Sequence, residues 1–142
     1  MRRQRRAGQP SWTPDADQPV IHLDANFLVR GLVPGSNEAA RIDAWLLSDE
    51  EVEISAVAWG EYLCGPLTAV EEAAARQLIR TVHPVAREEA ELAAQLFNLA
   101  GRRSRSFAVC SIAATAIRSG AKLATNNTAD FSRFQSHGLN LA

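Results

Sequence analysis

From residue 20 to the C-terminus, short apolar segments alternate with longer segments whose apolar residues recur at helical spacing. The expected strands are 20–24 (VIHLD), 51–55 (EVEIS), 81–86, 121–127 and 138–142, and the expected helices are 26–33, 37–48, 56–64, 67–80, 87–100 and 107–119. Parallel strands need crossover connections, so strands that alternate with helices predict a parallel sheet covered on both faces. We therefore expect a three-layer α/β domain with a central parallel sheet of four to five strands flanked by helices.

The chain is long enough for one domain with its own core, because 46% of its 142 residues are hydrophobic and 22% are charged. Residues 1–19 combine an arginine cluster with several prolines and lack a hydrophobic period, so we expect a disordered basic extension there. The domain then occupies 20–142. The formal net charge of -1 does not by itself favour nucleic acid as a partner.

The cysteines and the lengths of the apolar runs indicate the cellular compartment of the protein. Cys64 and Cys110 have no CxxC spacing and lie in apolar helical segments, so we expect buried free thiols in a reducing compartment. No apolar run reaches the roughly 20 residues of a membrane span. These features predict a cytoplasmic protein without a membrane partner. The three histidines show no recognisable metal-binding spacing, and no P-loop, dinucleotide or nucleophile-elbow motif occurs.

Polar residues gather where the expected strands end. Asp24 ends the first strand, Asn127 lies at the end of the fourth, and Asp130 follows one turn later. Glu61 lies in the helix after the second strand, among mostly apolar neighbours. Ligands of open α/β sheets bind outside the carboxyl ends of the strands. Carboxylates without His or Cys partners suit Mg²⁺ or Mn²⁺, which indicates metal-assisted phosphodiester hydrolysis.

Each of these residues also has a purely structural explanation. Asp24 can cap the following helix, Glu61 can be a solvated helix residue, and Asn126, Asn127 and Asp130 can form a turn that caps a short helix. The convergence of three oxygen-bearing positions at one end of one sheet favours a functional cluster over these separate explanations.

Four stretches together resemble the PIN domain, and most closely the VapC toxins of bacterial toxin-antitoxin pairs: VIHLDANFLVRGL, ISAVAWGEYLCG, RSRSFAVCSIAATAIRSGAKLATNNTADFSRF and GLNLA. The resemblance covers nearly everything after residue 19. It implies a PIN-like fold and a Mg²⁺- or Mn²⁺-dependent endoribonuclease that cleaves RNA. It also implies a homodimer, and a toxin-antitoxin hetero-oligomer in which a cognate VapB-like antitoxin fills a groove and obstructs the site.

The resemblance assigns site roles by motif position. Asp24 and Glu61 match the first and second metal-binding acids, and Asn127 matches the fourth position, where the family uses Asp or Asn. Three further residues belong to the implied site: Asp130, the acid before the Phe; Asn26, which supports the first Asp; and Thr125, the hydroxyl residue beside the site.

The chain departs from the family pattern at Val109, because the third acid belongs three residues before Ile112. Helix capping asks for an acid at the same place, since Val109 is the third residue after the potential cap Ser106. A valine cannot coordinate a cation, so we expect impaired catalysis. The other positions are intact, which favours an engineered or selected inactivation over a naturally degenerate site.

Substrate contacts are expected from the loop GRRSRS, whose Arg102, Arg103 and Arg105 can hold RNA phosphates beside the metal site. A solvated loop is the alternative. Two other functions remain open. The chain can be a catalytically inactive PIN module that binds RNA or an antitoxin. It can also be a phosphatase with Asp24 as nucleophile, but that chemistry wants a second Asp where this chain has Asn26.

Overall fold

The sheet has five strands, all parallel, in the order β3-β2-β1-β4-β5. The computed structural model describes residues 19–102 and 107–142. The strands are β1 (Val20–Leu23), β2 (Glu51–Ser55), β3 (Val82–His83), β4 (Lys122–Ala124) and β5 (Asn140–Leu141). The expected parallel sheet of four to five strands is therefore confirmed. Most of the expected N-terminal extension lies outside the described residues.

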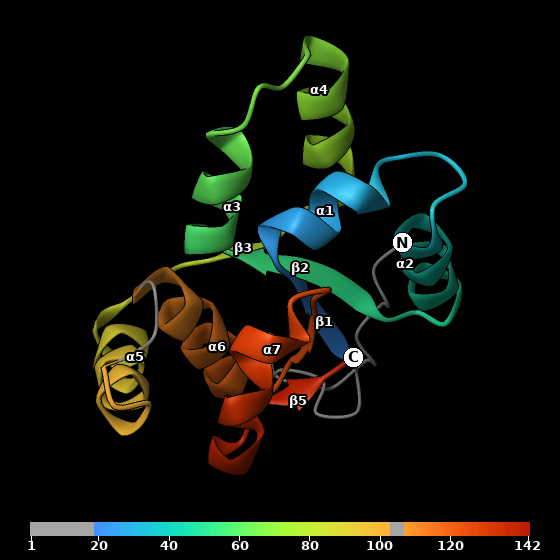
Figure 1. The fold of residues 1–142 in the computed structure, drawn as a ribbon. Helices are drawn as coiled ribbons and strands as arrows, with labels where there is room; N and C mark the ends of the chain where they lie inside the picture. Colours follow the sequence, from blue (N-terminus) through green and yellow to red (C-terminus); the bar gives the residue numbers. More distant parts are fainter. Residues whose placement is uncertain (1–18, 103–106) are drawn as a thin grey trace, which may run out of the picture.

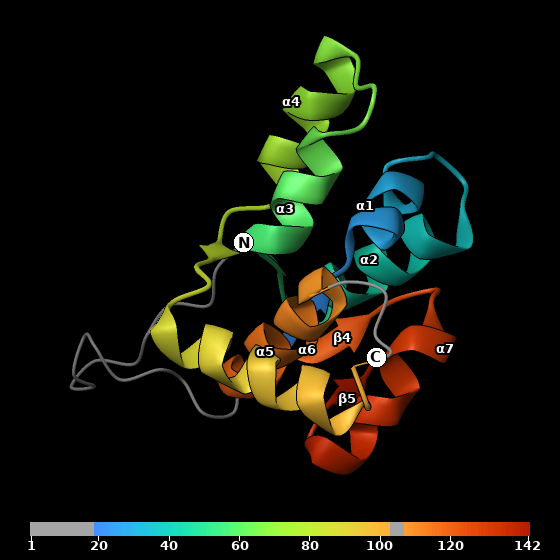
Figure 2. The same cartoon turned by 60° about the vertical axis from the view of Figure 1, so that its left-hand side comes forward.

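Helices cover both faces of the sheet, which confirms the expected three layers. They are α1 (Ala25–Gly31), α2 (Asn37–Leu47), α3 (Ala56–Leu63), α4 (Ala69–Leu78), α5 (Arg87–Leu99), α6 (Phe107–Ser119) and α7 (Thr128–Phe131), followed by the 3-10 helix η1 (Ser132–His137). Figures 1 and 2 show α1, α3 and α4 on one side of the sheet and α5 and α6 on the other. No helix in the described ranges is long and apolar enough to cross a membrane.

Capping side chains fix where several helices begin. Ser36, Ser55 and Thr68 each accept a hydrogen bond from a backbone N–H in the first turn of the helix that follows. The central helix α6 ends before Gly120, which adopts φ +69°, a conformation that favours glycine. Capping side chains thus fix the first residues of these helices, and Gly120 fixes the end of α6.

The core lies on both faces of the sheet, against α1, α2 and α3 on one side and α5 and α6 on the other. The strand residues Ile21, Leu23, Ile54 and Leu123 are at most 1% exposed. In α6 every residue from Cys110 to Ala116 is buried, which its many small side chains permit at close distance to the strands. Neither cysteine forms a disulfide in the part of the chain that the structure describes, and Cys110 is buried as expected. The expectation was wrong for Cys64, which is exposed because it caps the outer end of α3.

Four strands are shorter than expected, and β1 lacks only its last expected residue, Asp24. β3 ends at His83 because Pro84 has no N–H for the sheet. β4 ends at Ala124, after which Thr125 and the following asparagines turn the chain into α7. β5 contains two residues rather than five. The early end of β4 matters most, since it places polar side chains beyond the strand and next to the end of β1.

Candidate metal centre

Asp24 follows β1 directly and is only 6% exposed. Its backbone N–H donates to the carbonyl of Ala124 at 3.1 Å, which ties it to the end of β4. Its Oδ1 accepts the backbone N–H of Phe27 at 2.8 Å, so the carboxylate caps α1. Capping does not exclude metal binding, because two carboxylate oxygens offer about four lone pairs.

A series of hydrogen bonds joins Asp24 to the residues after β4. The hydroxyl of Thr125 donates to Asp24 Oδ2 and accepts the backbone N–H of Asn127 at 2.9 Å. The side-chain Nδ2 of Asn127 in turn donates to Asp130 Oδ2 at 2.7 Å. The structure thus brings four of the residues expected at the site into one hydrogen-bonded group.

Glu61 lies in α3, and its side chain is exposed. Partial desolvation raises the pKa of Glu61, and the negative charge of Asp24 raises it further. Burial also raises the pKa of Asp24, although hydrogen bonds from Thr125 and the Phe27 N–H act in the opposite direction. The negative charge of Asp24 disfavours ionisation of Glu61, and a bound cation would favour the ionised form of both carboxylates. The oxygen donors therefore fit Mg²⁺ or Mn²⁺.

Replacement of Asp24 tests whether burial of its ionised carboxylate destabilises the folded protein. In the folded state Asp24 binds its proton more tightly than in the unfolded chain, so its ionisation lowers stability as pH rises from about 3.8 through its raised pKa. We expect Asp24→Asn to raise the free energy of unfolding by roughly 1 kcal/mol at pH 7 in EDTA. Asparagine retains the helix cap.

Urea unfolding at pH 7 and at acidic pH measures the effect. The gain of Asp24→Asn should shrink as pH falls towards 3.8, the ordinary pKa of an aspartic acid. Asp24→Ala is the matched control, because it removes the charge and also both hydrogen bonds, and it should destabilise the protein. A loss of stability in Asp24→Asn at both pH values would contradict the assignment.

Val109 lies in the first turn of α6, partly buried against the core. Helix α6 contacts α3, which carries Glu61, so residue 109 belongs to a neighbouring helix of the same region. No acidic residue lies in the described first turn of α6. The helix therefore presents no carboxylate at the position where the family pattern has one.

The remaining expected residues are less tightly integrated. Asn26 is exposed in α1, and the hydrogen bonds that hold Asp24 come from Phe27 and Thr125 instead. Arg102 is exposed, and its Nε donates to Asn98 Oδ1 at 3.3 Å. Arg103, Arg105 and the expected cap Ser106 lie outside the described residues.

Glu38 reaches the same edge, and the sequence did not indicate it. It lies in the first turn of α2, and its Oε1 accepts a hydrogen bond from Asn126 Nδ2 at 3.2 Å. Arg30 Nε lies 3.8 Å from the same oxygen. An acid two residues after the cap Ser36 reads as an ordinary helix-start residue, so only the fold reveals its contact with the turn after β4.

Comparisons with known proteins agree with this geometry. A family model described as PIN domain matches residues 21–136. FitAcB from Neisseria gonorrhoeae is similar in structure with a TM-score of 0.65 and 24% identity, over 86% of this chain and 96% of that one. VapBC2 from Rickettsia felis, bound to a DNA fragment from its promoter, gives a TM-score of 0.70 and 17% identity over 87% and 97%.

The description of a third similar structure includes the reaction of that protein. Mycobacterium tuberculosis VapC20, described as a sarcin-ricin loop cleaving toxin, matches with a TM-score of 0.56 and 20% identity, over 86% of this chain and 98% of that one. No curated protein sequence matches this chain. At these identities the structural likeness establishes the fold.

Proposed function

This chain belongs to the PIN-domain family, and from that premise we propose that it is a metal-dependent endoribonuclease toxin of the VapC type whose catalysis is impaired at Val109. The observation that carries the proposal is the buried Asp24 carboxylate. It is held at the carboxyl end of β1 by Thr125 and Phe27, within electrostatic reach of Glu61.

The residues of the proposed site have different roles. Asp24, Glu61 and Asn127 would hold Mg²⁺ or Mn²⁺, which when bound activates a water and stabilises the leaving oxygen of a phosphodiester. The hydrogen bonds from Thr125 and Phe27 fix both oxygens of Asp24 in orientation. Asp130 accepts from Nδ2 of Asn127, which leaves the amide oxygen of Asn127 available as a ligand.

Binding of RNA and proteins is proposed from charge and exposed apolar area. Arg102, with Arg103 and Arg105 next to it in sequence, would neutralise RNA phosphates. Exposed apolar side chains on and after α1 and on α2 support a protein partner, which we propose to be a VapB-like antitoxin or a second copy of the chain. These side chains are Val29, Val33, Leu46 and Leu47.

A second function is favoured by one observation, the absence of a carboxylate at residue 109. A PIN module that lacks this acid can bind RNA or an antitoxin without cleaving. Such a protein would keep the arginines and the exposed apolar surface, and would lack only the metal-dependent step.

Cleavage of a labelled RNA stem-loop tests the proposal. We expect slow cleavage with Mn²⁺ or Mg²⁺, no cleavage in EDTA, and a decrease of at least about 10-fold in Asp24→Asn. RNA affinity, measured separately by anisotropy in EDTA, should be unchanged in this variant. Equal cleavage by both proteins would reject the nuclease site, whereas RNA or antitoxin binding without any cleavage would support the binding module.

A further inference from the structure

A second group of potential ligands lies in the sheet itself, away from the oxygen ligands at Asp24. His22 in β1, Glu53 in β2 and His83 in β3 lie on three adjacent parallel strands. The register pairs His22 with Glu53 directly. The histidine spacing along the chain had predicted no metal site, because these ligands are about thirty residues apart and meet only through the strand order.

We propose that His22, Glu53 and His83 form a binding site for Zn²⁺ or a similar transition metal. His83 Nε2 lies 2.6 Å from Glu53 Oε1, and His22 Nε2 lies 3.7 Å from the same oxygen. One ligand atom from each residue can be chosen so that all lie within 4.8 Å of one another. Tetrahedral Zn²⁺ bonds of about 2.0–2.1 Å place ligand atoms roughly 3.4 Å apart, so shifts of about 1 Å suffice.

The imidazole of His22 supplies an independent observation. Its side chain is 1% exposed, and within the described ranges Nδ1 has no hydrogen-bond partner. Its Nε2 lies 3.3 Å from Ser119 Oγ, which already donates to backbone carbonyls of α6. A buried ring nitrogen without a partner carries a desolvation cost, which coordination of the ion through Nδ1 would remove, whereas Nε2 is the nitrogen that faces Glu53 Oε1.

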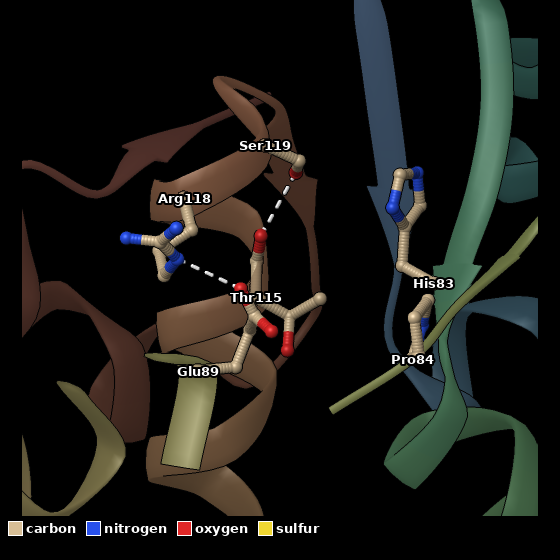
Figure 3. A pocket seen from close by; sticks show the side chains of 6 residues that line it. All are labelled: His83, Pro84, Glu89, Thr115, Arg118 and Ser119. Carbon is tan, nitrogen blue, oxygen red and sulfur yellow. Dashed lines mark hydrogen bonds and ion pairs between the residues drawn. The ribbon is translucent and has the colours of Figure 1, made fainter. Parts of the chain in front are cut away.

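A pocket next to His83 provides access. The cavity, about 240 Å³, is lined by His83, Pro84, Glu89, Thr115, Arg118 and Ser119. Figure 3 shows His83 and Pro84 on one side, facing Thr115, Arg118 and Ser119 of α6 and Glu89 of α5. The side chain of His83 is 30% exposed, whereas those of His22 and Glu53 are largely buried. An ion can therefore enter from the pocket and keep one coordination position open to it.

The donor set separates this site from the one at Asp24. Two imidazoles and one carboxylate suit Zn²⁺, Co²⁺ or Ni²⁺, whereas an all-oxygen set suits Mg²⁺ or Mn²⁺. Three protein ligands with an open fourth position are typical of zinc sites that bind water or a further ligand. On the pocket wall opposite His83, Arg118 forms an ion pair with Glu89, with 2.7 Å between Nε and Oε2.

Titration of the full chain with Zn²⁺ by calorimetry, and with Co²⁺ by its visible absorption, tests the proposal. A Cys64→Ser background removes the exposed thiol as a competing ligand. We expect one ion per chain with a Kd in the micromolar range, and at least about a 100-fold loss of affinity in His83→Ala. Zn²⁺ should raise the melting temperature of the parent protein and not that of His83→Ala.

Two matched controls isolate the cluster. His137→Ala removes an exposed histidine of η1, and Asp24→Asn alters the other candidate metal site; both should bind Zn²⁺ as the parent does. Glu53→Gln should weaken binding while it retains side-chain volume. If the parent takes up no stoichiometric Zn²⁺, or if folded His83→Ala binds it equally well, the cluster is a hydrogen-bonded histidine-glutamate group alone and the proposal is wrong.

Discussion

Val109→Asp is expected to increase metal-dependent RNA cleavage at least 100-fold over the unaltered chain, a change of about 2.7 kcal/mol in transition-state stabilisation. The new carboxylate would lie in the first turn of α6, a helix that contacts α3, which carries Glu61, and would add the third acid of the family pattern. A negative charge near a helix N-terminus is also favourable. Initial rates with saturating Mn²⁺ or Mg²⁺ provide the measurement.

Stability should change in the opposite direction. Residue 109 is partly buried against the core, so an aspartate there loses hydration. We expect Val109→Asp to lower the free energy of unfolding by roughly 1–2 kcal/mol in EDTA. Millimolar Mg²⁺ should recover part of this loss, because a ligand that binds only the folded state stabilises it.

Val109→Asn separates charge from shape, because it matches aspartate in size but adds no negative charge. It should give much less cleavage than Val109→Asp. The double variant Val109→Asp with Asp24→Asn should be inactive, which excludes a contaminating nuclease. A folded Val109→Asp protein that binds Mg²⁺ but cleaves no better than the parent would overturn the nuclease proposal.

Phe27→Ala is expected to destabilise the protein by about 3–5 kcal/mol, because it leaves a cavity in the core. The Phe27 ring is fully buried, stacks on Trp45 at a centroid distance of 5.8 Å, and has the Arg41 guanidinium 5.3 Å from its centroid. Urea unfolding measures the loss. Alanine keeps the backbone N–H that donates to Asp24, but loss of the buried ring loosens the start of α1, so metal-dependent cleavage by Val109→Asp should fall when the two changes are combined.

Val29→Ala is the matched control in the same helix. Its side chain is 46% exposed, so truncation should change the free energy of unfolding by no more than about 0.5 kcal/mol. If Phe27→Ala and Val29→Ala lower the free energy of unfolding by similar amounts, α1 is not anchored through Phe27.

The order of the elements could be predicted because their local signals are strong. The helix 107–119 was expected with the bounds that α6 has, since its apolar run ends at Gly120. Asp24 and Thr125 could be placed near each other because both follow strands of one parallel sheet. Whether these residues act in catalysis stays a prediction, and the importance of Val109 rests on the family pattern.

Contacts that depend on strand order could not be predicted from the sequence. Nothing in the periodicity places β2 between β1 and β3, so the meeting of His22, Glu53 and His83 was missed. The contact between Glu38 and Asn126 was missed for a similar reason, because it joins α2 to the turn after β4. Short-range patterns determine elements and their ends, whereas these clusters arise from the arrangement of distant segments.

The hydrogen bonds that orient Asp24 come from Phe27 and Thr125, and none of them involves residue 109. The orientation of Asp24 is thus fixed independently of residue 109, where the family pattern has its third acid. A valine codon and an aspartate codon can differ by a single base. A lineage that carries this fold can therefore gain or lose the carboxylate in one mutational step, without rebuilding the surrounding architecture.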